Sequence, residues 1–169
     1  MSDSDRQSWP DVERRERRDR RSGADRRNES GWLSVPLDQG AAATLFEAAA
    51  QARANAQAGY SGFKVGAALE TVDGPVITGC NVENASYSLT VCAERVALLK
   101  AISDGHHQFT RILVVADTVS PTPPCGPCRQ LLWEYCGDID VILANLDGPS
   151  SRHRLSELLP LPFDNRLLK

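Results

Sequence analysis

The sequence predicts an α/β protein of three layers, in which helices cover both faces of a mixed sheet of about five strands. Helical and extended patterns follow one another in the order α-β-β-α-β-α-β, which is typical of a sheet flanked by helices. The turn signal Asp73-Gly74 separates two extended stretches and predicts a β-hairpin. The run 111–117 is apolar almost throughout, as expected of a strand buried on both faces.

Each predicted element has its own local signals. The first helix is predicted from residue 41 to about residue 58, with Asp38 or Gly40 as its N-cap. A second helix begins near Val91, where apolar side chains start to recur at helical spacing, and it stops at Asp104. The other predicted elements are strands at 64–71, 76–80, 111–117 and 141–146, a polar loop at 81–90, and helices at 127–135 and 155–159.

Length and composition describe an ordinary globular chain. Its 169 residues are 41% hydrophobic and 24% charged, and the formal net charge is −3. This length suits one domain, and the mildly acidic balance argues against a nucleic-acid surface. No stretch approaches the roughly 20 apolar residues of a membrane span, and no signal-peptide core is present, so we expect a cytoplasmic protein. Five cysteines in such a chain favour metal binding over disulfides.

The N-terminal part of the chain differs from the rest. We expect a disordered, charged tail over 1–36 and a folded domain over 37–169. Residues 1–30 contain nine arginines and eight acidic residues, and the run 14–21 has no apolar face to bury. A solvated tail is the first interpretation, and an arginine-rich arm that contacts RNA or an acidic partner is the alternative.

Two short clusters carry the candidate chemistry. The stretch 92–95 (Cys-Ala-Glu-Arg) opens one predicted helix, and the stretch 124–130 (Pro-Cys-Gly-Pro-Cys-Arg-Gln) opens another. Both place thiols at helix N-termini, where the helix dipole favours thiolate. Cys92, Cys125 and Cys128 then offer three protein ligands, the number found in catalytic zinc sites, which keep a fourth position open for water. We therefore expect one Zn²⁺ per chain.

The excess negative charge of such a zinc site must be balanced by nearby positive groups. Three thiolates around Zn²⁺ leave a net charge of about −1, which makes a bound water harder to deprotonate. The two helix N-termini contribute about half a positive charge each. Arg95 adds a full positive charge three residues after Cys92, near the same helix face. Our hypothesis is that Arg95 hydrogen-bonds the ligating sulfurs.

The direction of the Glu94 side chain depends on where its helix begins. Glu94 lies two positions after Cys92, so an ideal helix of 3.6 residues per turn would point the two side chains about 200° apart. This conflict eases if Cys92 occupies the non-helical N-cap position.

The remaining cysteines and histidines receive simpler interpretations. The tetrad 125–128 also matches the thioredoxin active site, but Pro124 stands where that family usually has Trp, and the chain after Cys128 is too short for the rest of that fold. Cys80 and Cys136 lack a partner pattern and are expected to be packing residues. We expect three histidines at the surface without a metal role: His106, His107 and His153.

The two clusters match the signature of zinc-dependent deaminases, which is His-x-Glu or an all-Cys counterpart followed by Pro-Cys-x-x-Cys. Beyond that signature, the chain closely resembles the tetrameric, three-cysteine cytidine deaminases over about residues 37–165. The matching stretches follow in the same order and spacing: 60–68 (Tyr-Ser-Gly-Phe-Lys-Val-Gly-Ala-Ala), 79–88 (Gly-Cys-Asn-Val-Glu-Asn-Ala-Ser-Tyr-Ser), 92–95 and 124–130. The resemblance implies hydrolysis of cytidine or deoxycytidine to uridine or deoxyuridine plus ammonia, in pyrimidine salvage.

The resemblance also assigns the chemistry of the site. Cys92, Cys125 and Cys128 correspond to the metal ligands, and Glu94 corresponds to the acid/base. Glu94 would take a proton from water, deliver it to N3 of the base and later protonate the departing amine. That role requires a raised Glu94 pKa when the substrate excludes water.

A set of substrate-binding residues is implied in the same way. Asn81 and Glu83 would bind the ribose hydroxyls, and Phe63 would pack against the pyrimidine. Tyr87 and Phe163 would contribute at the boundaries of a homotetramer that shares its active sites. The full implied set is Phe63, Asn81, Glu83, Ala93, Tyr87 and Phe163.

Three alternative functions fit the sequence less well. A blasticidin-type deaminase shares the Cys and Glu signature, but the intact ribose-binding stretch 81–84 argues against it. Deaminases of polynucleotides carry His at the first ligand position, where this chain has Cys92. A non-catalytic zinc-binding interaction module would have no use for Glu94.

Overall fold

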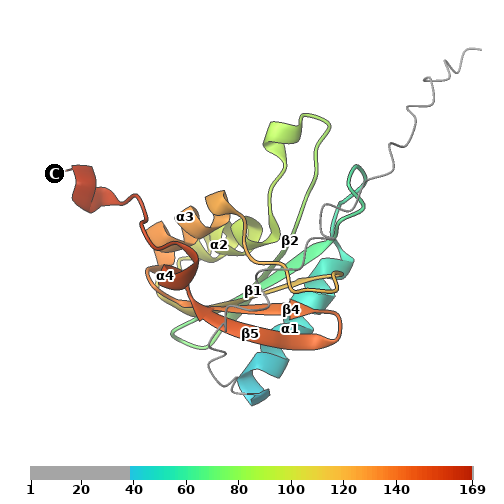
Figure 1. The fold of residues 1–169 in the computed structure, drawn as a ribbon, viewed down its shortest axis with the longest axis horizontal. Helices are drawn as coiled ribbons and strands as arrows, with labels where there is room; N and C mark the ends of the chain where they lie inside the picture. The colour runs from blue at the N-terminus through green and yellow to red at the C-terminus, as the bar shows by residue number, and fades with distance from the viewer. Residues whose placement is uncertain (1–38, 169) are drawn as a thin grey trace, which may run out of the picture. The chain divides into compact units, whose positions relative to one another are not determined.

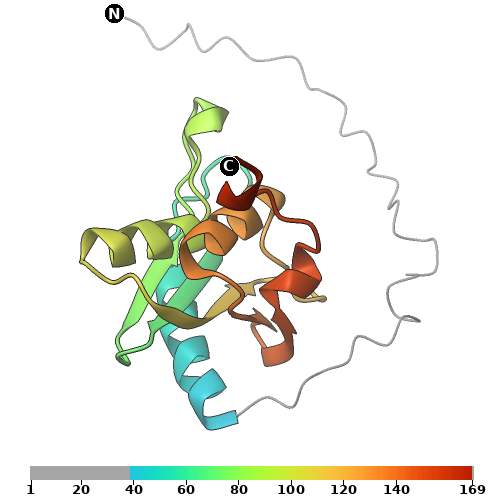
Figure 2. The ribbon, with the colours of Figure 1, turned by 90° about the vertical axis from the view of Figure 1, so that its left-hand side faces the viewer.

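The structure is a computed structural model that describes residues 39–168, and these residues form the predicted three layers (Figure 1). Five strands make one mixed sheet in the order β2-β1-β3-β4-β5. Helix α1 covers one face, while α2, α3 and α4 lie on the other (Figures 1 and 2). The predicted fold class is therefore confirmed. The tail predicted over 1–36 lies outside the described residues.

The element bounds follow the predicted order closely. The helices are α1 (Gln39–Ala54), α2 (Ala93–Ser103), α3 (Gly126–Cys136) and α4 (Leu155–Leu158), and the strands are β1 (Val65–Thr71), β2 (Val76–Cys80), β3 (Phe109–Ala116), β4 (Asp140–Asn145) and β5 (Gly148–Arg154). Two short 3-10 turns are η1 (Tyr87–Leu89) and η2 (Asn165–Leu168). Within residues 39–168, the helices are all too short or too polar to cross a bilayer.

The sheet explains the apolar run in the middle of the sequence. β1 pairs antiparallel with β2, as the turn signal predicts, and also with β3, while β3 pairs in parallel with β4. Side chains of β3 alternate between two cores. Ile112 and Val114 face α2 and α3, whereas Leu113 and Val115 face α1. Because both faces of β3 are covered, its run 112–116 is entirely apolar.

Small residues bring α2 close to the sheet. A Cβ atom at Gly79 of β2 would lie 2.4 Å from the carbonyl oxygen of Ala93 and 2.5 Å from the backbone nitrogen of Ala97. Any side chain at position 79 would therefore collide with the first turn of α2. Ala93, Ala97 and Ala101 are fully buried along this contact. The close approach fixes the N-terminal end of α2, which carries the first chemical cluster.

Helix α1 ends at Ala54 rather than near residue 58 as predicted. The chain leaves the helix because the backbone of Gln57 pairs with a distant loop. Its N–H donates to the carbonyl of Asn81 at 3.0 Å, and its carbonyl accepts from the N–H of Glu83 at 2.8 Å. These bonds override the helix propensity of the alanines around residue 57.

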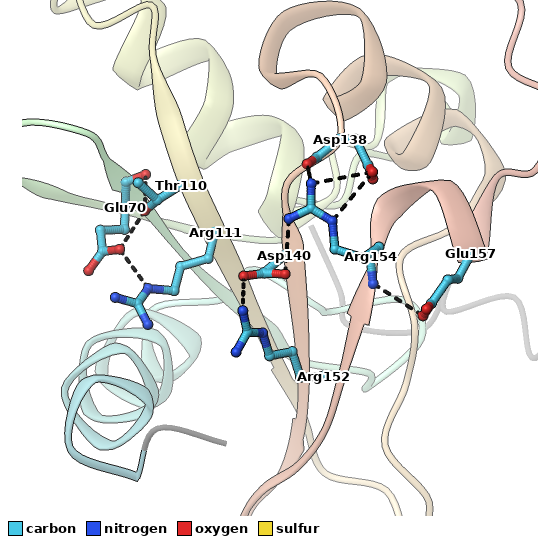
Figure 3. Close-up of polar contacts among 8 residues, drawn as sticks. All are labelled: Glu70, Thr110, Arg111, Asp138, Asp140, Arg152, Arg154 and Glu157. Atoms are coloured by element: carbon cyan, nitrogen blue, oxygen red, sulfur yellow. Dashed lines mark hydrogen bonds and ion pairs between the residues drawn. The ribbon is translucent and has the colours of Figure 1, made fainter. Parts of the chain in front are cut away.

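Strand β5 was absent from the predicted elements. Its sequence, Gly-Pro-Ser-Ser-Arg-His-Arg, lacks the apolar alternation of a strand, but its backbone pairs antiparallel with β4. Ion pairs reinforce that pairing (Figure 3). Arg152 contacts the Asp140 carboxylate at 2.5 Å, and Arg154 contacts the carboxylates of Asp138 and Asp140 at 3.3 and 3.2 Å.

The expectations for the lone cysteines and the histidines were partly confirmed. Cys136 packs against the core, and its burial raises the pKa of the thiol to about 12. Cys80 is half-buried. The surface placement of His153 was wrong: only 5% of it is exposed, because it lies on β5 at the pairing with β4. His106 is half-buried and His107 is exposed.

Candidate metal centre and active site

Helix α2 begins directly after the first candidate ligand. Cys92 is its N-cap, with extended backbone angles of φ −71° and ψ 155°. Ideal helix geometry therefore does not relate Cys92 to Glu94, and the conflict raised by their spacing disappears. Glu94 is only 5% exposed, and its carboxyl hydrogen-bonds the thiol of Cys128. The carboxyl thus lies beside the cysteines.

The second cluster is arranged in the same way at α3. Cys125 is the N-cap, Pro127 lies in the first turn, where its missing N–H costs nothing, and Cys128 is buried one turn into the helix. The Sγ atoms of Cys92, Cys125 and Cys128 all lie within 4.8 Å of one another. The distance between the Cys92 and Cys125 sulfurs is 3.8 Å. Tetrahedral zinc with Zn–S bonds of about 2.3 Å separates its sulfurs by about 3.8 Å, so the three thiols fit this metal.

The three thiols of the cluster differ in the direction in which their pKa values are shifted. Hydrogen bonds from the thiols of Cys128 and Cys125, together with the charge of Arg95, lower the pKa of Cys92 to about 6 against the effect of burial. Burial raises the pKa of Cys125, and the hydrogen bond to Cys92 raises that of Cys128. Metal binding must therefore displace the protons of Cys125 and Cys128.

Arg95 provides independent evidence for a negatively charged group at this site. Its Nε is buried and has no hydrogen-bond partner among residues 39–168. Such a donor is costly to bury without a partner. The three thiolates of a zinc-bound site would supply a hydrogen-bond acceptor for this Nε. The predicted hydrogen bonds from Arg95 to the ligating sulfurs stay a prediction.

The electrostatics of Glu94 suit proton transfer. Burial, with a smaller contribution from the neighbouring Cys92 thiolate, raises the pKa of its carboxyl to about 7, although Arg95 opposes the shift. A carboxyl with a pKa near 7 can both accept and release a proton close to neutral pH. A strongly shifted carboxyl beside a metal-ligand cluster is typical of an active site.

Asn81 lies at the end of β2 and binds the backbone that leads into β1. Its Oδ1 accepts a hydrogen bond from the N–H of Val65, and its Nδ2 donates to the carbonyl of Phe63, both at 2.8 Å. Asn81 is 7% exposed, whereas Phe63 is 39% exposed. The structure therefore brings these two predicted substrate-binding residues into direct contact, with Asn81 fixing the backbone of Phe63.

Glu83 is held by the turn that precedes Phe63. Its carboxylate accepts hydrogen bonds from the backbone N–H groups of Tyr60 and Ser61, at 2.8 and 3.1 Å, and from the Ser61 hydroxyl. These bonds, with that of the Ser61 hydroxyl foremost, lower the Glu83 pKa. A carboxylate has about four acceptor positions, so one stays available. Ser61 was not among the predicted site residues, although it lies beside Gly62 in a stretch that matches the family and carries a turn signal.

The other predicted substrate-binding residues differ in exposure. Tyr87 is 65% exposed on η1, within the arm 82–91 that projects from the three layers (Figure 2). Phe163 is 58% exposed in the segment after α4. Ala93 is fully buried at the first position of α2. Aromatic side chains this exposed on one chain are available to a neighbouring chain.

The fold and the site define an α/β metalloprotein with a three-cysteine zinc centre and a buried carboxyl poised for proton transfer. A family model described as the cytidine and deoxycytidylate deaminase zinc-binding region matches residues 41–144. The chain belongs to this family.

Relatives and solved structures agree with that assignment. The cytidine deaminase of Halalkalibacterium halodurans is 54% identical over 120 residues, which cover 70% of this chain and 91% of the relative. The crystal structure of the Burkholderia pseudomallei cytidine deaminase superposes with a TM-score of 0.70 at 48% identity, covering 72% of this chain and 98% of that chain. A blasticidin-S deaminase of Bacillus cereus is 33% identical over 107 residues, 59% of this chain and 76% of the relative.

Proposed function

We propose that this protein is a cytidine deaminase, which hydrolyses cytidine or deoxycytidine to uridine or deoxyuridine and ammonia. The observation that carries the proposal is the buried Glu94 carboxyl, with a pKa of about 7, beside three sulfurs spaced for zinc. Cytidine deaminases at 54% and 49% identity supply the substrate class. The reaction serves pyrimidine salvage in the cytoplasm.

Cys92, Cys125 and Cys128 hold one Zn²⁺. When bound, zinc supplies Lewis-acid activation of a water molecule near neutral pH. Glu94 accepts the proton that this water releases and delivers it to N3 of the cytosine ring as the water oxygen bonds to C4. Glu94 then takes the remaining proton from the new C4 hydroxyl and passes it to the amino group, so that the C4 carbonyl forms, the C4–N bond breaks and ammonia leaves.

The nucleoside is bound by the loops around β1 and β2. Glu83 offers its remaining acceptor position to a ribose hydroxyl, and Asn81 stands next to it in the same loop. Phe63, whose backbone Asn81 holds, packs its ring against the pyrimidine. Glu83 is pre-oriented by Tyr60 and Ser61, so little side-chain freedom is lost when the sugar binds.

The chain acts as a homotetramer in which neighbouring subunits complete each active site. Tyr87 and Phe163 supply this contact, whereas Ala93 binds the substrate beside the metal centre. Support comes from the exposed aromatic side chains of the arm 82–91 and of the C-terminal segment. Large apolar side chains at these exposed positions are available for contact with a neighbouring subunit.

Ammonia release tests the proposal directly. The full chain is incubated with cytidine, deoxycytidine, deoxycytidylate and blasticidin S, while zinc per chain is measured and Glu94→Ala serves as the matched control. Turnover of cytidine or deoxycytidine with one zinc per chain is expected. Turnover of blasticidin S alone would favour the second candidate, to which the Bacillus cereus relative points. Zinc without turnover of any substrate would indicate a non-catalytic module.

Sedimentation tests the assembly separately. A tetramer is expected at micromolar concentration. Phe163→Ala should raise the KM for cytidine, while the variant should still sediment as a tetramer. A monomer with full turnover would contradict shared active sites.

A further inference from the structure

Arg129 joins the metal-binding loop to the C-terminal part of the chain. It follows the ligand Cys128 on α3. Its Nε donates a hydrogen bond to the carbonyl oxygen of Pro124 at 2.8 Å, and its Nη1 donates to the carbonyl oxygen of Leu158 at 2.7 Å. Pro124 directly precedes the ligand Cys125, and Leu158 is the last residue of α4. One half-buried guanidinium therefore holds two segments that are far apart in the sequence.

The bond to Pro124 bears on the position of a ligand sulfur. It fixes the peptide group between Pro124 and Cys125, and rotation of that group would move the Cys125 side chain. The backbone N–H of Arg129 also donates to the carbonyl of Cys125 at 3.0 Å. Arg129 thus holds the backbone on both sides of the Cys125 Cα. The planar guanidinium fork also fixes the separation of the Pro124 and Leu158 carbonyls, which a flexible lysine does not.

Two further side chains of α3 bind the segment that follows α4. Gln130 donates to the carbonyl oxygen of Phe163, and Trp133 donates to the carboxylate of Asp164 at 3.4 Å. The segment that carries Phe163 is therefore attached to the helix whose first turn carries two of the three ligands.

We propose that Arg129 is a positioning residue that couples zinc binding to the docking of the C-terminal segment 159–168. When zinc binds to the cysteines, it restricts the motion of the loop that contains Pro124, whose carbonyl Arg129 binds. The side chain of Arg129 is then held more firmly in place, and this strengthens its hydrogen bond to the Leu158 carbonyl. Linkage makes the effect reciprocal, so a docked segment raises the affinity of the cysteines for zinc. The proposal rests on the zinc site of the proposed function but not on the identity of the nucleoside.

Zinc affinity is the first measurement, made on the full chain by competition with a chelator of known affinity. Because Arg129 orients a ligand, Arg129→Ala should weaken zinc binding about 10- to 100-fold. Arg129→Lys, which keeps the charge but not the fork, should weaken it about 10-fold. Arg152→Ala is the matched control, because Arg152 is also half-buried and hydrogen-bonded, to Asp140 at the β4–β5 pairing. Zinc affinities of both Arg129 variants within about twofold of the control would overturn the proposal.

Hydrogen exchange of residues 159–168, with and without zinc, is the second measurement. Zinc should slow exchange there, relative to β3, in the wild type and in Arg152→Ala but not in Arg129→Ala. A residue that only stabilises the fold would lower protection everywhere and leave the zinc-dependent difference intact. Equal zinc-dependent protection in Arg129→Ala would therefore overturn the proposal. If the alanine variant does not fold, Arg129→Lys replaces it in both measurements. Neither measurement needs a substrate.

Discussion

The metal centre and the ion pairs at the end of β5 are both clusters of charged groups, but they differ in how far their members are satisfied. The β5 network comprises Asp138, Asp140, Arg152, Arg154 and Glu157 (Figure 3). Each carboxylate in it accepts hydrogen bonds from an arginine or a backbone N–H. At the metal centre, Glu94 has a raised pKa, the pKa values of the three cysteines are shifted in different directions, and the Arg95 Nε has no partner within residues 39–168.

The difference shows how a functional site can be told from a structural one. A network in which every carboxylate is bonded within the chain needs no further group, and it holds a polar strand in the sheet. A cluster with perturbed pKa values and an unpaired buried donor is completed by something outside the chain. Substitutions in the two regions should therefore affect different quantities: chemistry at the metal centre, and stability at the β5 network.

Removal of the metal should have the largest effect. Protein treated with a chelator is expected to lose deamination to the background rate and to regain it with zinc. Reloading near pH 7.5 should release protons from Cys125 and Cys128, whose pKa values are raised, whereas Cys92, with a pKa of about 6, is already ionised. An indicator dye in weak buffer measures this release. Reloading without proton release would show that all three cysteines are thiolates beforehand.

Glu94→Ala should have the next largest effect. Turnover is expected to fall at least about 10³-fold while zinc content stays at one per chain, because the variant lacks the group that moves protons. Glu157→Ala in the β5 network is the matched control and should leave turnover unchanged. Loss of zinc together with activity would reassign Glu94 to a structural or ligand role.

The candidate site was largely predictable because its metal ligands and its acid/base lie in two short sequence motifs. Two clusters at helix starts specify three thiols, and their placement needs only the correct helix boundary. The one conflict, between Cys92 and Glu94, came from applying helix geometry to a residue whose ψ of 155° places it outside the helix. The predicted strands likewise follow local apolar patterns, which the sheet confirms.

Features that depend on distant partners escaped prediction. Strand β5 is polar and becomes a strand only through its pairing with β4. The end of α1 is set by the loop that pairs with Gln57. The role of Arg129 depends on Leu158, which lies far along the chain. A single sequence contains no local signal for any of these contacts.

Arg95→Gln should have a smaller effect than the substitution of Glu94. If the guanidinium offsets the excess negative charge of the three thiolates, its loss should lower turnover about 10- to 100-fold. Arg154→Gln in the β5 network is the control, since Arg154 already binds Asp138 and Asp140. An Arg95→Gln enzyme that keeps both zinc and normal turnover would contradict the hypothesis.

Asp138→Asn should have the smallest effect, and only on stability. Burial alone would raise the Asp138 pKa, but hydrogen bonds from Ser156 and the charge of Arg154 outweigh it and lower the pKa below 3.8. A lowered pKa means that the ionised carboxylate stabilises the fold above about pH 3.8, and that this stability is lost as the pH falls through the lowered value. Because Asp138 is partly exposed, its loss should cost about 1 kcal/mol of unfolding free energy.

Urea unfolding of the wild type and Asp138→Asn at several pH values tests this. The difference in unfolding free energy should be constant between about pH 7 and pH 5 and should narrow below about pH 3.8. Turnover at pH 7 should not change. A change in turnover as large as that of Arg95→Gln would show that the β5 network acts on the metal centre. The contrast between the two regions would then fail, because a cluster of fully bonded charges would contribute to catalysis as well as to stability.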